Sequence, residues 1–144
     1  MRETTVYKCS DTKFEKPFRI MVGGSSGSGK TTLVKNIVDG NHFSSPFFRI
    51  VYCYPSYLEE APIEFDSIIE YRPGGIDLEY FSTLPKNSLI ILDDMMSECA
   101  KSDDVMKLFL SRKILKLIIT ITNYKYKLYI LSIVIFIYFS TLNL

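Results

Sequence analysis

Short apolar runs alternate with glycine-rich or helical stretches along the first two thirds of this chain. Three runs rich in β-branched or aromatic residues, 18–22, 47–54 and 88–92, are typical of buried strands. Residues 31–38 instead repeat their apolar positions with helical spacing, and Gly40 follows as a candidate left-handed C-terminal cap. Continuous apolar strands separated by helices favour a parallel sheet that is covered on both faces.

Weaker patterns lie between these elements. Residues 68–71 are consistent with a short strand before the turn signal at 73–75, and residues 78–84 with one or two helical turns. Residues 1–16 are polar and mixed, which indicates a loose arm or a short edge strand. We therefore expect an α/β fold with a mostly parallel sheet, formed by residues 17–123.

The C-terminal segment 124–144 has a different pattern. Residues 128–144 carry no charge, and about 17 residues is the lower limit for a helix that crosses a bilayer. Lys125 and Lys127 come immediately before this stretch, as on the cytoplasmic side of an anchor. Three interpretations stay open: a membrane helix, buried strands of the sheet, and translated noncoding sequence without selected structure.

Composition adds three limits to this picture. A chain of 144 residues with 47% hydrophobic and 23% charged residues fits one globular domain and excludes a disordered protein. The three cysteines are widely spaced and include no CxxC pair, which argues against a zinc site and favours reduced thiols inside the cell. The N-terminus begins no apolar run, so we expect no secretory signal and a cytoplasmic or nuclear location.

The strongest candidate chemistry follows the first predicted strand. The segment Gly24-Ser25-Ser26-Gly27-Ser28-Gly29-Lys30-Thr31, followed by Thr32, matches the phosphate-loop (Walker A) pattern G-x-x-x-x-G-K-[ST] in full. Glycines let backbone N–H groups point inward at phosphate oxygens, and the next helix adds the positive end of its dipole. Lys30 would supply charge to the β- and γ-phosphates, and Thr31 a hydroxyl to Mg²⁺. A flexible Gly/Ser linker, the alternative, needs neither residue at this offset.

A second candidate site ends the strand 88–92. Asp93 and Asp94 follow this apolar run, as in a Walker B strand that delivers a carboxylate beside the phosphate loop. We expect Asp93 to hold Mg²⁺ and Asp94 to orient or deprotonate the attacking water. A polar transition from strand to loop is the alternative for both acids. Together the two motifs predict a P-loop protein that binds ATP with Mg²⁺.

Three segments together resemble viral DNA-packaging ATPases, a family of FtsK/HerA-like motors with relatives in virus-derived elements of animal genomes. The segments are the strand-loop-helix 17–32, the strand 49–54 and the run 87–98. The resemblance covers roughly residues 16–110 and implies a three-layer P-loop NTPase core. It also implies a homo-oligomeric ring that hydrolyses ATP to move double-stranded DNA, with Lys30, Thr31, Asp93 and Asp94 in the roles given above.

The chain departs from the family pattern after residue 110. Ser111-Arg112-Lys113 stands where a longer basic stretch with histidine is expected. The run 119–123 echoes the strand and polar sensor of the family, but without the glutamine. We therefore expect the core to be incomplete on its C-terminal side, which bears on hydrolysis and translocation more than on nucleotide binding.

Two other functions stay open. A nucleotide or small-molecule kinase would share the P-loop and Mg²⁺ site, but only Arg72 and Arg112 are candidates for its basic lid. A non-catalytic remnant, with or without a membrane tail, would bind nucleotide and not turn it over.

Predictions for five further residues follow from position alone. We interpret His42 as a solvated loop residue and Cys53 as a core residue. Lys107, Arg112 and Lys113 could contact DNA phosphates or supply an arginine finger, but a solvated helix face is the interpretation we favour.

Overall fold

The computed structural model describes residues 13–14, 19–74 and 76–94 in full, together with the backbone of Phe18, 117–123 and 134–139. Its elements are β1 (Phe18–Gly24), α1 (Lys30–Asp39), β2 (Arg49–Tyr54), β3 (Glu70–Pro73), α2 (Leu78–Thr83), β4 (Ser88–Asp93), β5 (Leu117–Asn123) and β6 (Val134–Phe139). The predicted α/β class is confirmed, because strands alternate with helices along the chain.

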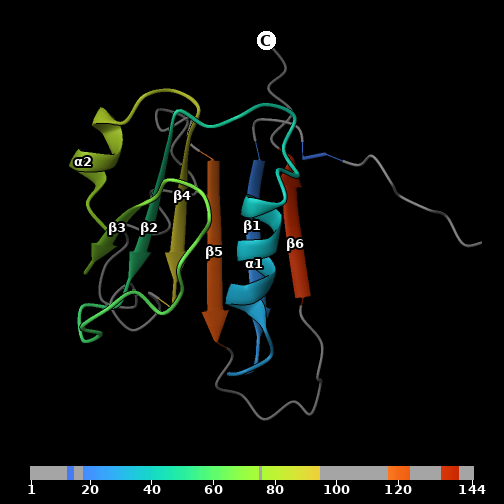
Figure 1. Ribbon diagram of the computed structural model, residues 1–144, viewed down its shortest axis with the longest axis vertical. Coiled ribbons are helices and arrows are strands. Elements are labelled where there is room, and N and C mark those ends of the chain that lie inside the picture. The colour runs from blue at the N-terminus through green and yellow to red at the C-terminus, as the bar shows by residue number, and fades with distance from the viewer. Residues whose placement is uncertain (1–12, 15–17, 75, 95–116, 124–133, 140–144) are drawn as a thin grey trace, which may run out of the picture.

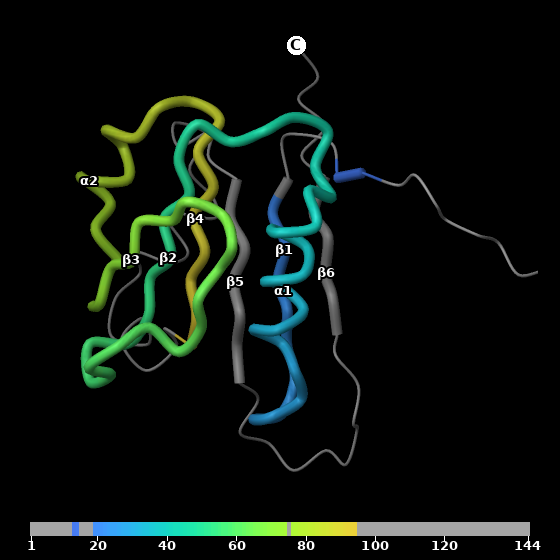
Figure 2. The backbone as a smooth tube through the Cα atoms, viewed as in Figure 1, coloured from blue at the N-terminus to red at the C-terminus, as the bar shows by residue number. Residues whose placement is uncertain are grey.

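One sheet has the strand order β3-β2-β4-β5-β1-β6 (Figures 1 and 2). The strands β3, β2 and β4 form an all-parallel unit, and β5 extends the parallel pairing from β4 to β1. The sixth strand, β6, is antiparallel to β1. Parallel pairing places the carboxyl ends of β1 and β4 at the same edge of the sheet, although β5 separates the two strands.

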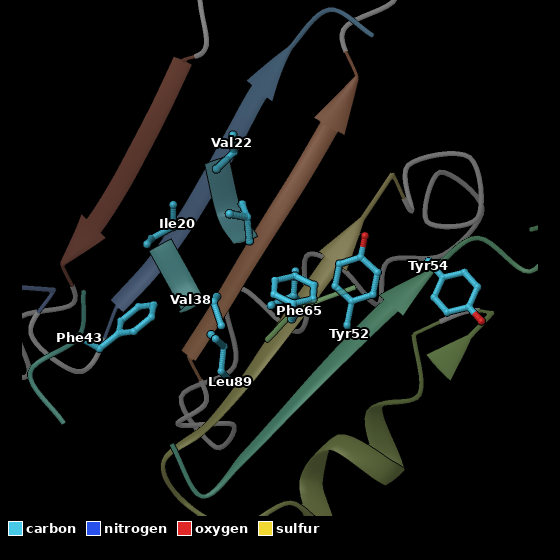
Figure 3. Packing of buried hydrophobic residues seen from close by; sticks show 10 residues of the cluster. Ile20, Val22, Val38, Phe43, Tyr52, Tyr54, Phe65 and Leu89 are labelled. Carbon is cyan, nitrogen blue, oxygen red and sulfur yellow. The ribbon is translucent and has the colours of Figure 1, made fainter. Parts of the chain in front are cut away.

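The strands β2 and β4 present apolar side chains on both faces of the sheet, since successive side chains of a strand point to opposite sides. One cluster lies under α1 and comprises Ile20, Val22, Val34, Val38, Phe43, Tyr52, Tyr54, Phe65, Leu89 and Ile91 (Figure 3). The other cluster includes α2 and comprises Val51, Cys53, Phe81, Leu84, Ile90 and Leu92. Thus α1 and α2 lie on opposite faces, and β2 and β4 are covered on both.

The central strand β4 is buried along its whole length. Full burial of one large apolar side chain stabilises the fold by about 1.5–3 kcal/mol. Replacing Ile90, which packs against the face covered by α2, with alanine would therefore cost about 2–5 kcal/mol, including the cavity left behind. The continuous apolar run in the sequence is thus explained by burial on two faces.

The end of α1 differs from the prediction in one respect. Gly40 is the C-terminal cap, but its φ of −73° is right-handed, and Asn41 takes the left-handed conformation with φ 54°. Gly40 is required by space and not by φ, since a Cβ there would lie 2.6 Å from the carbonyl oxygen of Asn36 and from Nε2 of His42. Asparagine tolerates the left-handed region, so the turn moves one residue on.

Two strands start later than the apolar pattern predicts. β2 starts at Arg49, because Phe47 belongs to the loop before the strand. Its ring packs edge-on against that of Phe43, with centroids 4.7 Å apart. β3 starts at Glu70 rather than Ile68, whose side chain is 98% exposed. An apolar run alone does not distinguish a strand from the loop that leads into it.

The ends of the chain are described in part. In the predicted arm 1–16, Phe14 forms a short parallel bridge with Phe43. In the tail 124–144, residues 134–139 form the strand β6, so these six residues match the sheet interpretation; the rest of the tail lies outside the described residues. Within the described part of the chain, no helix has the length and apolar character needed to cross a membrane.

Candidate functional site

The candidate site lies at the edge of the sheet where β1 and β4 end. The chain leaves β1 at Gly24, turns through residues 25–29 and enters α1 at Lys30. Asp93 ends β4 at the same edge. Between them β5 ends at Asn123, which is in register with Gly24. Residues more than sixty positions apart in sequence therefore meet at one edge.

The loop 25–29 depends on glycine at two positions with positive φ. Gly27 has φ 73° and Gly29 has φ 87°. Residues that carry a Cβ adopt this backbone conformation only with strain. A Cβ on either residue would meet no atom within 4 Å, so the requirement comes from the backbone. Gly24 differs, since a Cβ there would lie 2.8 Å from Oγ of Ser28.

Lys30 is a buried cation, 6% exposed, at the start of α1. Its Nζ donates a hydrogen bond to the carbonyl oxygen of Ser25, 2.7 Å away, and so closes the loop on itself. Burial lowers the pKa of Lys30, while the charges of Asp93 and Asp94 act in the opposite direction. Within the described residues no carboxylate forms an ion pair with Lys30, which leaves its charge available to an anion.

No side chain of the described residues caps the N-terminus of α1. Gly29 occupies the cap position without a side-chain hydrogen bond, and the first turn holds no acidic residue. Oγ of Ser28 is the only buried side-chain N or O atom of the described residues that lacks a hydrogen-bond partner. Uncapped N–H groups, the helix dipole and an unpaired hydroxyl at one place favour an anion.

Asp93 connects this loop to the sheet. It is 5% exposed, and its Oδ2 accepts hydrogen bonds from the hydroxyls of Thr31, 3.1 Å away, and Tyr52. Burial raises the pKa of Asp93, as does the charge of Asp94, while both hydroxyls and Lys30 lower it. Burial and the Asp93 charge raise the pKa of Tyr52, so its phenol stays a proton donor at neutral pH. The carboxylate is thus held by neutral donors.

Asp94, next along the chain, has a left-handed backbone with φ 49°. Aspartate enters this region more readily than most residues, and Asn41 and Asn87, which lie outside the site, share it. Asp94 and Asp93 border a cavity of about 360 Å³. The phosphate loop and the start of α1 line it with Ser26, Gly27, Gly29, Lys30, Thr31 and Thr32, and the segment after β2 adds Pro55, Tyr57, Leu58 and Pro62.

The structure brings most of the predicted site residues together. Gly24 to Thr32, Asp93 and Asp94 surround one edge of the sheet, with Ser25, Ser26 and Thr32 exposed to solvent. His42 is exposed and Cys53 is buried, both as predicted, and burial raises the pKa of the Cys53 thiol to about 12. The predicted cationic candidates Lys107, Arg112 and Lys113 lie outside the described residues.

Tyr52 is a site residue that the sequence analysis did not identify. Its signal was a phenol in the middle of an apolar strand, because a buried tyrosine hydroxyl usually has a hydrogen-bond partner. The identity of that partner, Asp93, could not be read from sequence, since it lies 41 positions away.

A larger cavity, of about 750 Å³, lies at the other end of β2 and β3 and includes Phe43, Phe47, Ile69 and Glu70. It contains no residue of the phosphate loop and neither Asp93 nor Asp94. Size alone therefore does not define the candidate site, which is distinguished by its combination of loop, buried cation and carboxylate.

Comparison of the chain with protein-family models, curated proteins and solved structures finds no match.

Proposed function

We propose that this chain is a P-loop ATPase of the viral DNA-packaging type, which binds ATP with Mg²⁺ and hydrolyses it to move double-stranded DNA. The observation that carries the nucleotide part is the contact between Thr31 and Asp93 beside the buried Lys30. The DNA part depends on the resemblance of the three sequence segments.

The phosphate loop has the features that a triphosphate requires. Gly27 and Gly29 turn the backbone through positive φ, and α1 begins without a cap. Lys30 would exchange its contact with the Ser25 carbonyl for phosphate oxygens, which are stronger acceptors because they are charged. Ser28 would gain the partner that its buried hydroxyl lacks among the described residues.

The donors at the carboxyl end of β4 fit Mg²⁺. Thr31 and Asp93 offer two hard oxygens, and Mg²⁺ is usually held by one or two protein ligands with phosphate and water oxygens completing the shell. The described residues contain no cluster of three or more His, Cys, Asp or Glu that would bind a metal alone. The ion would supply positive charge to neutralise the phosphate oxygens.

Asp94 would accept a hydrogen bond from the attacking water and position it. The cavity that it borders places it on the same side as Lys30. Lys30 and the loop amides would stabilise the charge that develops on the transferring phosphoryl group. Asn123 ends the strand between Gly24 and Asp93 and is our candidate for the polar sensor. A homo-oligomeric ring would supply the catalytic arginine from a neighbouring subunit.

A kinase is the first alternative function and would share every feature of the phosphate site. Of its two candidate lid residues, Arg72 is part of β3. Its guanidinium lies 3.7 Å over the ring of Tyr80 in α2 and 3.5 Å from the carboxylate of Glu70. This placement favours a structural role for Arg72, and Arg112 lies outside the described residues. The second alternative is a remnant that binds nucleotide without turnover.

The proposal is tested by ATP turnover of the full chain with Mg²⁺, with and without double-stranded DNA. Lys30→Met is the comparison, because methionine keeps much of the side-chain length and removes the charge. DNA-stimulated turnover that is lost in this variant supports the motor. Binding without turnover indicates the remnant, phosphorylation of an added nucleoside monophosphate indicates the kinase, and absence of ATP binding contradicts the whole proposal.

The proposed location is the cytoplasm or nucleus, and a membrane attachment through 128–144 is the alternative. Partition of a fusion of these residues between vesicles and buffer separates the two.

A further inference from the structure

Tyr52 lies one strand away from the phosphate site and touches it at a single atom. Its side chain is fully buried, and its hydroxyl donates to Oδ2 of Asp93. Figure 3 shows this hydroxyl beside the carboxyl end of β4, while the hydroxyl of Tyr54 points away from it. The contact is the only polar contact of the Tyr52 side chain within the described residues.

The ring of Tyr52 is fixed by aromatic neighbours. Phe65 and Tyr71 meet it edge-on, with centroids 5.3 and 5.9 Å away, and Tyr54 lies 6.2 Å away. A ring packed in this way has little rotational freedom, so the direction of its hydroxyl is set before any ligand arrives. The donor is therefore rigid, in contrast to a donor on a mobile loop.

The two hydroxyl donors converge on one oxygen of Asp93. Thr31 and Tyr52 both donate to Oδ2, and Oδ1 accepts no hydrogen bond from the described residues. A fully buried Oδ1 would be a buried atom without a hydrogen-bond partner, and among the described residues only Oγ of Ser28 is such an atom. Oδ1 is therefore accessible to solvent. One carboxylate oxygen is thus held by the protein and the other is left for a ligand.

We propose that Tyr52 is a positioning residue for divalent-cation binding: by holding Oδ2, it presents Oδ1 of Asp93 to the metal. This inference depends on the proposed Mg²⁺ site at Thr31 and Asp93. If the Thr31 hydroxyl binds the cation and gives up its hydrogen bond to Asp93, the Tyr52 hydroxyl remains as the protein donor that keeps the carboxylate in place. Outer-shell partners of this kind typically change metal affinity about 10- to 100-fold when they are removed.

The test uses Tyr52→Phe, which keeps the ring contacts and removes the hydroxyl. Tyr54→Phe is the matched control, since Tyr54 is a buried tyrosine on the same face of β2 whose hydroxyl makes no hydrogen bond with the described residues. Mn²⁺, a spectroscopic substitute for Mg²⁺, is titrated into the full chain with and without ATP, and free Mn²⁺ is measured by electron paramagnetic resonance. Circular dichroism checks the fold of each variant.

We expect the Mn²⁺ dissociation constant of Tyr52→Phe to rise at least about 10-fold, with that of Tyr54→Phe unchanged. Equal constants for Tyr52→Phe and the unsubstituted chain would overturn the inference, and so would an unsubstituted chain that binds no Mn²⁺ under either condition. An unsubstituted chain that binds Mn²⁺ but turns over no ATP would overturn the ATPase proposal alone.

Discussion

The hydroxyl of Thr31 donates a hydrogen bond to the carboxylate of Asp93, with 3.1 Å between Oγ1 and Oδ2 and 62 positions between the residues in sequence. This contact joins the first turn of α1 to the end of β4. Both groups are hard oxygen donors, and under the proposed function they are the residues that would hold Mg²⁺ beside the phosphates.

Thr31 provides the first prediction. Thr31→Val keeps the shape of the side chain and removes the hydroxyl, whereas Thr31→Ser keeps the hydroxyl. We expect the valine variant to need at least about 10-fold more Mg²⁺ for half-maximal ATP turnover, because a metal ligand is lost. The serine variant should resemble the unsubstituted chain. A Mg²⁺ titration of turnover measures this, and equal midpoints for valine and serine would contradict the role of the hydroxyl.

Asp94 provides the second prediction, which separates binding from hydrolysis. Asp94→Asn removes the charge, and asparagine tolerates the left-handed backbone that this position has at φ 49°. We expect turnover to fall about 100-fold or more, as for a lost general base, with ATP affinity little changed. Single-turnover hydrolysis and equilibrium binding are the two measurements. Glu64→Gln, an exposed acid outside the site, is the control, and unchanged turnover in Asp94→Asn would exclude the base role.

Gly29 provides the third prediction, for stability. Gly29 has φ 87°, and a Cβ added there would meet open space. Gly29→Ala should therefore lower the free energy of unfolding by about 1–2 kcal/mol, through backbone strain alone. Gly29→Asn should cost less, since asparagine enters the left-handed region more readily. Urea unfolding of the three chains tests this order. An alanine variant as stable as the glycine chain would show that the loop relaxes to another conformation.

Asp39 provides the fourth prediction, which includes pH. Its carboxylate accepts hydrogen bonds from Lys35, from the backbone N–H groups of Asp66 and Ser67, and from the Ser67 hydroxyl. Burial alone raises the pKa of Asp39, but these donors outweigh it and the pKa lies below its ordinary value. We expect Asp39→Ala to lose about 1–3 kcal/mol of unfolding free energy at neutral pH.

The sign of the pH dependence follows from that direction. A carboxylate whose pKa is lower in the folded state contributes its full stabilisation above the unfolded pKa of about 4, and the contribution is lost as pH falls through the folded pKa. The difference between Asp39→Ala and the unsubstituted chain should therefore shrink below about pH 4. Unfolding curves from pH 7 to pH 3 measure it, with Glu64→Ala as the exposed control. A difference that stays constant with pH would contradict the assignment.

The sequence by itself determined the type and approximate position of the local elements, and the glycine loop that matches the phosphate-loop pattern. Glycines at fixed offsets before Lys30 and Thr31 carry a local backbone requirement, and local requirements are visible in local sequence. The strand 88–92 was equally clear, because burial on both faces leaves a continuous apolar run. The handedness of Gly40 was predicted wrongly, since a contact with Asn36, not φ, explains the glycine.

Only the tertiary structure decided the order of the strands and the hydrogen bond between Tyr52 and Asp93. Strand order placed β5 between β1 and β4. Parallel pairing brought Asp93 to the edge where Lys30 begins its helix, which the Walker B pattern had predicted without the intervening strand. The hydrogen bond from Tyr52 to Asp93 depends on the register of β2 against β4, where Tyr52 is opposite Ile91. Such contacts join residues that are distant in sequence, and they are fixed by packing of the whole sheet. No local pattern in the chain encodes them.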